Sequence, residues 1–211
     1  MATPLDAVTT IHKAFRRDIA EIDDAAYKAA AGDGDLSVVV DRLRFFSDIL
    51  RWHANGEEEM GFPTMDRVAP LVARPYFLDH RELDMMTEGL AKVSATSDPL
   101  VTARATASLN THLRIHLDKE DSHLYPILRE RTSANEQASI VGTMSRAVPP
   151  ERMPELIHWW LPLVGLDDRG ATISVWKALM PEQVFAGAKP LIQDTIGQDW
   201  AELTRRIPGL A

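Results

Sequence analysis

Two segments of the chain repeat one pattern of histidine, glutamate and proline. The first begins His53-Ala-Asn-Gly-Glu57 and the second His116-Leu-Asp-Lys-Glu120. In each, an acidic residue follows the glutamate, and an aromatic residue and a proline stand nine and ten positions after the histidine. Residues four apart lie on one face of an α-helix, one turn apart, so each histidine points the same way as its glutamate. The repeat predicts two similar helical hairpins.

A single histidine precedes each of these segments on the helix before it, at His12 and His80. Each lies about as many residues before the turn of its hairpin as its partner, His53 or His116, lies after that turn. Since an α-helix rises about 1.5 Å per residue, the two members of each pair should lie at similar heights. The spacing therefore predicts that four histidines and two glutamates converge at one level.

Apolar residues recur at intervals of three and four over the first 130 residues, which is typical of amphipathic helices. We expect an all-α, up-down-up-down four-helix bundle and no β-sheet. Asp35 and Asp98 should cap the second and fourth helices. Gly61, Phe62 and Pro63 should end the second helix, and Pro126 should bend or break the fourth. The expected helices cover about residues 5–31, 36–59, 76–94 and 98–131, with one helical turn after residue 64.

Residues 132–211 differ in composition from residues 1–131, which we take as the bundle domain. This C-terminal extension holds four of the five tryptophans and seven of the 13 prolines. We expect several shorter helices packed on the bundle, because aromatic residues contribute strongly to buried area. The extension fits three roles: capping the bundle, restricting access to the histidines, or forming a homodimer. The residues expected in core and interface contacts are Trp159, Trp160, Trp176 and Trp200, with His158 a packed or surface histidine.

The composition excludes several classes of function. The chain of 211 residues has no cysteine, which rules out disulfides, thiolate zinc sites, Fe–S clusters and a thiol nucleophile. A formal net charge of −8 argues against nucleic acid or an anionic membrane as partner. No segment has the roughly 20 apolar residues of a membrane helix, and the N-terminus does not read as a signal peptide. We expect a soluble, cytoplasmic protein.

Imidazole and carboxylate groups without thiolates suit iron, manganese or zinc. Two bridging glutamates with terminal histidines form the ligand set of a dinuclear site inside a four-helix bundle. A bundle of this kind without metal is disfavoured, because buried carboxylates without partners are costly. The predicted metal ligands are His12, His53, Glu57, His80, His116 and Glu120.

This pattern resembles that of the hemerythrin-like (HHE cation-binding) family over about residues 6–130. The resemblance implies a non-haem centre of two iron ions (Fe²⁺/Fe³⁺), oxo- or hydroxo-bridged, inside an antiparallel bundle. It also implies two carboxylates that bridge the irons, and an open coordination position for a small ligand. Carried over to this chain, the resemblance makes Glu57 and Glu120 the bridging residues.

The chain departs from the oxygen-carrying members of that family at two positions. Those members have a second histidine on the third helix, four residues after the first, where this chain has Asp84. They also use an aspartate five residues after the last histidine, where this chain offers Asp121 beside Glu120. We prefer Glu120 because it mirrors Glu57, and Asp121 is the alternative. A carboxylate in place of an imidazole makes the site more anionic and favours ferric iron, whereas a reversible oxygen carrier needs the ferrous state.

Two further histidines share the stripe of the predicted ligands. His112 lies one turn before His116, and His123 lies seven residues after it. Each is either an extra metal ligand or a hydrogen-bonding neighbour of the metal centre. For His123, a position at the solvent-exposed end of the bundle also fits. Phe62 and Tyr125 should pack rather than ligate. The acidic residues expected on a solvated face are Glu58, Glu59 and Glu82.

Two functions from different classes fit these observations. The first is a di-iron protein that binds or reacts with a small oxidant, hydrogen peroxide, nitric oxide or dioxygen, including the enzymatic decomposition of peroxide or nitric oxide. The second is a non-catalytic oxygen, iron or redox sensor, or an iron-binding protein, that signals through the C-terminal extension.

Overall fold

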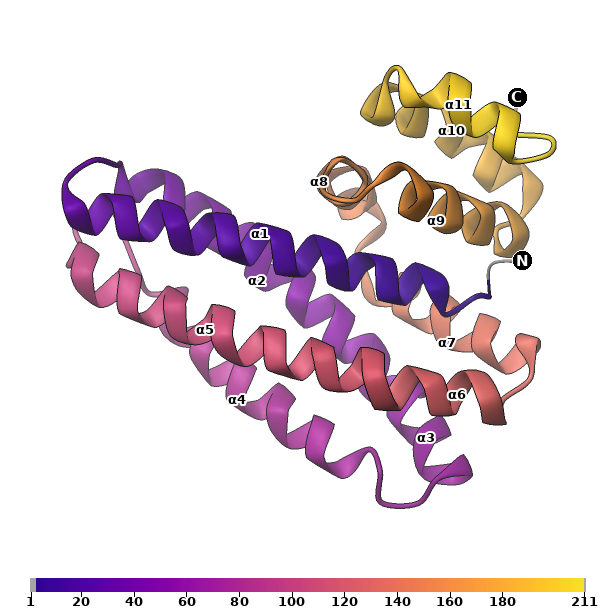
Figure 1. The fold of residues 1–211 in the computed structure, drawn as a ribbon, viewed down its shortest axis with the longest axis horizontal. Helices are drawn as coiled ribbons and strands as arrows, with labels where there is room; N and C mark the ends of the chain where they lie inside the picture. Colours follow the sequence, from indigo (N-terminus) through magenta and orange to yellow (C-terminus); the bar gives the residue numbers. More distant parts are fainter. Residues whose placement is uncertain (1–2, 211) are drawn as a thin grey trace.

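The computed structural model describes residues 3–210, and over that range it contains helices and no strand. Four long helices run up and down beside one another to form a bundle (Figure 1). This arrangement confirms the predicted fold class. The four helices are α1 (Asp6–Ala31), α2 (Leu36–Gly56), α4 (Arg74–Leu90) and α5 (Pro99–Lys119).

The turns at the narrow end of the bundle carry the expected caps. The side chain of Asp35 accepts a hydrogen bond from the backbone N–H of Ser37, and Asp98 accepts from the backbone at the start of α5. Gly32 ends α1 with φ of 85°, a conformation that glycine adopts without strain. The turns of both helical hairpins therefore lie close to where the sequence predicts.

The second helix does not stop where the sequence predicted, whereas the fourth ends at Arg131 as expected. α2 passes into a π-helical turn, η1 (Glu57–Gly61), and continues as α3 (Phe62–Val68). α5 passes in the same way into η2 (Glu120–Leu124) and continues as α6 (Tyr125–Arg131). The prediction that Gly61, Phe62 and Pro63 end the second helix is wrong. Near Pro126 the fourth helix is interrupted by a π-turn but does not end.

The wide π-turns explain why the prolines are tolerated. The N–H of Phe62 donates to the carbonyl of Glu57, and that of Tyr125 to the carbonyl of Glu120, five residues back in each case. Each proline therefore lies in the first turn of a new α-helix, where its missing N–H leaves no bond unmade. Both π-turns begin at the paired glutamates, and such turns are frequent at functional sites.

The C-terminal extension is helical and lies along one side of the bundle (Figure 1). Its first helix contacts α2 and η1, and the next two α-helices contact α1. This confirms the prediction of additional helices packed on the bundle. The elements are α7 (Ala134–Ala147), the 3₁₀ turn η3 (Pro150–Arg152), α8 (Met153–Leu163), α9 (Leu166–Leu179), α10 (Glu182–Ile196) and α11 (Asp199–Arg206).

Tryptophans of the extension make core and interface contacts, as expected. Trp160 and Trp176 are buried, and their rings meet edge to face with centroids 5.3 Å apart. Trp159 reaches the bundle, where its Nε1–H donates to Asp18 of α1 over 2.7 Å. His158 stays within the extension, with its Nδ1 2.9 Å from the hydroxyl of Thr195. Within the described residues, no helix combines the length and the apolar character needed to cross a membrane.

Gly56 is the point where α7 comes closest to the bundle. A Cβ built on Gly56 would lie 2.5 Å from the Cα of Met144. Although alanine favours helix more than glycine does, Gly56→Ala should lower the free energy of unfolding by about 1–3 kcal/mol through overpacking. Denaturant unfolding measures the change.

Gly142→Ala, within α7 itself, is the matched control. A Cβ there would find its nearest neighbour, an Arg146 side-chain nitrogen, at an ordinary 3.5 Å. This substitution should raise the free energy of unfolding by about 0.5–1 kcal/mol. Equal changes for the two variants would contradict the close contact between α7 and the bundle.

Candidate metal centre

The six predicted ligands come together in the interior of the bundle, and all six are buried. Four long helices each contribute one histidine, because the two hairpins place those residues at matching heights. The two glutamates are the first residues of the π-turns, so they follow directly from α2 and α5. The predicted convergence at one level is what the structure shows.

The donor atoms form two groups of four that share both glutamates. In one group they come from His12, His53, Glu57 and Glu120, and in the other His80 and His116 replace the first two histidines. Within each group, all donor atoms lie within 4.8 Å of one another.

The carboxylate oxygens of Glu57 are divided between the two groups. Oε1 lies 3.3 Å from Nε2 of His53, and Oε2 lies 3.4 Å from Nε2 of His80. Glu120 is divided in the same way, with Oε1 3.3 Å from Nε2 of His116 and Oε2 3.6 Å from Nε2 of His12. Each glutamate thus presents one oxygen to each pair of histidines.

Several polar atoms in this cluster have no hydrogen-bond partner among residues 3–210. These are Oε2 of Glu57 and both carboxylate oxygens of Glu120, all buried. In addition, the Nε2 atoms of His12 and His53 face each other at 3.0 Å. Buried polar atoms without partners are rare and costly, and cations bound between these donors would satisfy them. The residues present therefore fit a metal, and their imidazole and carboxylate donors suit iron, manganese or zinc.

The two glutamates have opposite pKa shifts. Burial raises the pKa of Glu57, but the nearby imidazoles of His53 and His80 outweigh burial and hold that pKa well below its usual range. Burial, followed by the nearby charge of Glu57, raises the pKa of Glu120 well above its usual range. Without a cation, a charge on Glu57 is therefore favoured, and a second charge on Glu120 is opposed.

Carboxylates outside the cluster hold the outer ring nitrogens of its histidines. Nδ1 of His12 lies 2.9 Å from Oδ1 of Asp121, whose other oxygen accepts from Arg16 over 2.7 Å. Nδ1 of His116 lies 3.3 Å from Asp79. Such partners orient a metal-binding imidazole and fix which nitrogen faces the ion. Asp121 thus lies beside the centre, behind His12.

Glu58 has the same role on the opposite side of the centre. Its Oε1 lies 3.0 Å from Nδ1 of His80, and its Oε2 accepts from Arg81 over 2.9 Å. The expectation that Glu58 belongs to a solvated face was therefore wrong. The repeat contained the signal, since Glu58 follows Glu57 as Asp121 follows Glu120.

The aromatic residues of the repeat also reach the centre. The ring of Phe62 packs against that of His80, with centroids 4.9 Å apart, and Tyr125 meets His12 edge to face at 5.6 Å. Both residues pack, as predicted. The sequence analysis missed that the Tyr125 hydroxyl donates a hydrogen bond to Oε1 of Glu57. The available signal was a tyrosine in one copy where the other has phenylalanine.

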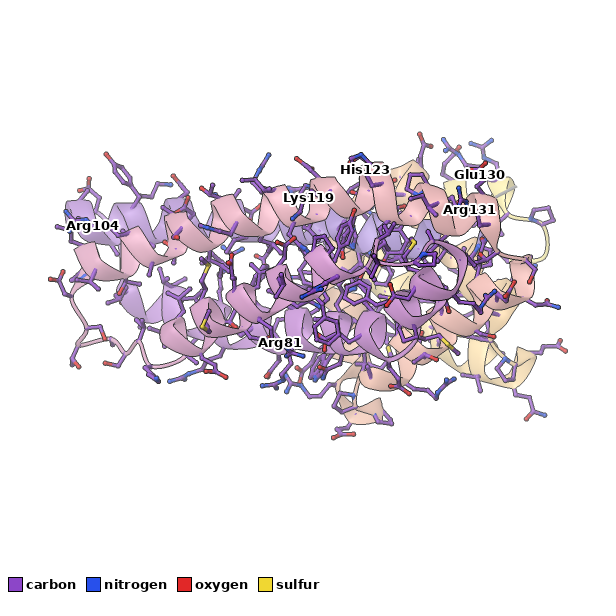
Figure 2. The ribbon with its side chains drawn as sticks, turned by 90° about the horizontal axis from the view of Figure 1, so that it is seen from below. Arg81, Arg104, Lys119, His123, Glu130 and Arg131 are labelled. Atoms are coloured by element: carbon purple, nitrogen blue, oxygen red, sulfur yellow. The ribbon has the colours of Figure 1, made fainter. Side chains whose placement is uncertain are left out.

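The remaining candidate ligands lie outside the two groups. Asp84 pairs with Arg81 at 3.2 Å. His112 is exposed, with Nδ1 2.8 Å from the carbonyl oxygen of Ser108. His123 is exposed at the outer edge of the bundle (Figure 2).

Comparisons with known proteins agree with this geometry. The family model of the hemerythrin HHE cation-binding domain matches residues 3–128. Zinc finger protein BRUTUS of Arabidopsis thaliana is 27% identical over 186 residues, which cover 85% of this chain and 15% of that protein. A BRUTUS-like zinc finger protein of the same plant is 21% identical over 204 residues, covering 86% of this chain and 16% of its own length. No solved structure matches the chain.

The chain spans about a sixth of the length of these two relatives. The match with BRUTUS covers 85% of the chain, whereas residues 3–128 are only about three fifths of it. The aligned region therefore includes part of the C-terminal extension, which lies outside the family model.

Replacing Glu120 and replacing Glu57 by glutamine should change the free energy of unfolding of the metal-free protein in opposite directions. Because burial and Glu57 oppose a charge on Glu120, the wild-type protein loses stability as pH rises above the unfolded pKa of 4.5. Glu120→Gln removes this loss and should raise the free energy of unfolding at about pH 8.

Glu57→Gln should instead lower that free energy by about 1–3 kcal/mol, because ionised Glu57 is stabilised by its histidines and by Tyr125. This contribution is present above the unfolded pKa and is lost as pH falls. Urea unfolding of both metal-free variants between about pH 4.5 and pH 8 measures the effects. A change of the same sign in both variants would contradict the assignment of charges.

The carboxylates behind the histidines should tune metal affinity. Glu58→Gln and Asp121→Asn should each weaken metal binding by about 10–100-fold and leave the number of bound ions at saturation unchanged. Titration against a chelator of known affinity measures this. Glu59→Gln is the matched control, since Glu59 is exposed on the same turn as Glu58, and an equal loss there would refute the specific role of Glu58.

Proposed function

The chain belongs to the hemerythrin HHE cation-binding family, and we propose that it is a non-haem di-iron protein that binds or reacts with a small oxidant. His12 and His53 would hold one iron, and His80 and His116 the other. Glu57 and Glu120 would each give one oxygen to each iron. The oxidants that fit such a centre are dioxygen, nitric oxide and hydrogen peroxide.

The division of the carboxylate oxygens is the observation that carries the proposal. Each glutamate has one oxygen near each pair of histidines. One ion in one group would leave oxygens that face the other group without a partner, whereas two ions would satisfy them all. Four protein donors per ion are also fewer than an octahedral metal accepts, which favours a position open to an added ligand.

A bound iron pair would supply Lewis acidity and electrons to a small ligand. The protein's own contribution is to bury the centre, to orient the imidazoles through Asp121, Glu58 and Asp79, and to hold a proton. That proton is on the Tyr125 hydroxyl, which donates to Glu57. Burial and the charge of Glu57 raise the pKa of Tyr125 well above its usual range, so the hydroxyl keeps its proton at neutral pH.

The space beside the centre supports a very small ligand. A cavity of about 10 Å³ is lined by His53, His80 and His116, a volume at the limit for one water-sized molecule. An organic substrate does not fit a space of this size. A ligand of a few atoms is therefore favoured over an organic one.

A second function, sensing of oxygen, iron or redox state without catalysis, is favoured by one contact. Gly56 directly precedes Glu57 and packs against Met144 of α7, so a displacement of Glu57 on metal binding would act on the extension. Two relatives of the chain are zinc finger proteins about six times longer than it. A metal-responsive domain within a longer protein fits that context.

Metal analysis of the protein after iron reconstitution tests the first function. We expect two irons per chain, and one fewer in His53→Ala or His116→Ala, since each variant removes a donor from one group only. The iron-loaded protein should react with at least one of the three oxidants faster than free iron does. The zinc-loaded protein, which has no redox chemistry, is the control.

One iron or none per chain after reconstitution would disprove the di-iron centre. Two irons without any reaction, together with changed tryptophan emission on loading, would instead support the sensing function. Trp52 and the tryptophans of the extension provide that signal.

A further inference from the structure

A second cavity lies between the bundle and the C-terminal extension. Its volume is about 80 Å³, and its walls come from α1, α2, α7, α8 and α9. His53, a proposed iron ligand, forms part of the wall. Because an apolar protein cavity of about 150 Å³ binds benzene or xenon, this space suits a molecule smaller than benzene.

The lining of this cavity is almost entirely apolar, with walls that include Val8, Ile49, Val141, Met144, Leu156 and Trp176. The polar groups of the wall are the imidazole of His53, the hydroxyl of Ser145 and the indole N–H groups of Trp52, Trp160 and Trp176. Ser145 already donates its hydroxyl hydrogen to the carbonyl of Val141, over 2.9 Å. Trp160 is buried, and its Nε1–H has no acceptor among residues 3–210.

An ordered water needs two to four polar partners, and hydrogen peroxide has comparable needs. The cavity therefore disfavours both. A neutral, apolar molecule loses little hydration when it enters the cavity. At most, it needs one weakly accepting atom for the indole N–H of Trp160. Diatomic gases meet this description.

We infer that this cavity binds a neutral diatomic gas, dioxygen or nitric oxide, and delivers it to the metal centre along His53. The inference rests on the proposed function and narrows its ligand from small oxidants in general to apolar ones. His53 is the connecting residue, since it lines both this cavity and the smaller one that reaches His80 and His116.

The inference also assigns a role to the extension. α7, α8 and α9 supply about half of the cavity wall, so the bundle alone would leave the face of α1 and α2 beside His53 open to water. Helices α7, α8 and α9, which carry no recognisable motif, thus complete an apolar cavity beside a metal centre made of charged groups.

Xenon-129 NMR of the metal-free 211-residue chain tests the cavity independently of iron. The wild-type chain should bind xenon at one saturable site. Val141→Leu and Val148→Leu add volume to the lining without altering a metal ligand, and each should weaken xenon binding by on the order of threefold or more. Two positions are used so that one variant decides the matter if the other fails to fold.

Val39→Leu is the matched control for overpacking. Val39 is fully buried near the start of α2 and does not line this cavity. Its xenon affinity should equal that of the wild-type chain.

Stopped-flow mixing of the iron-loaded chain with nitric oxide tests the delivery step. Val141→Leu and Val148→Leu should slow association by a factor similar to their loss of xenon affinity, and should leave the rate with hydrogen peroxide unchanged. Val39→Leu should leave both rates unchanged.

A wild-type chain that binds no xenon would overturn the inference. The inference would also be overturned if Val141→Leu and Val148→Leu lost xenon binding but kept the wild-type rate of association with nitric oxide. Neither result would contradict the proposed function. Iron-loaded wild-type protein that binds neither gas would instead refute the proposed ligand, and with it the delivery step, even where xenon binding persists.

Discussion

The structure depends on the electrostatic repulsion between two buried carboxyl groups in the interior of the bundle. Glu57 and Glu120 lie in one cluster, shielded from water, and their charges oppose each other. A proton on Glu120 would relieve the repulsion in the metal-free protein, and bound cations would relieve it by neutralising both carboxylates. Metal binding is therefore linked to folding and to proton release. The buried histidines stabilise the charge on Glu57 in the metal-free protein and would be donors to the bound cations.

The repeat gives the centre an approximate twofold arrangement that extends beyond the donor atoms. Each hairpin supports a histidine of the other: Phe62 of the first hairpin packs on His80 of the second, and Tyr125 of the second packs on His12 of the first. The carboxylates behind those histidines also cross between hairpins. The symmetry breaks at Tyr125, whose hydroxyl donates a hydrogen bond to one shared glutamate, Glu57, whereas the other copy has Phe62 at this position. A centre with equivalent donors on both sides thus has a hydroxyl donor on one side only.

Helix geometry explains which parts of this centre the sequence could predict. A spacing of four along a helix and matched distances from a turn are local rules, so the six clustered residues followed from them. The role of Glu58 did not, because within a run of three glutamates it looks like any solvated residue, and only contact with His80 distinguishes it. The position of the extension depends on close packing between distant residues, such as Gly56 against Met144, which has no periodic signature. Composition alone indicated that its tryptophans are packed.

The prolines that seemed to end the helices explain how the centre gains its aromatic neighbours. In a regular α-helix, Phe62 would lie five positions after Glu57 and about 140° away around the axis. The five-residue hydrogen bond of the π-turn brings it back toward the face that carries Glu57. Pro63 favours this wide turn, because its ring would clash with the carbonyl four residues earlier in a continuous α-helix. The aromatic-proline pair therefore sets the local helix geometry that lets Phe62 reach His80 and, in the second copy, lets Tyr125 reach Glu57.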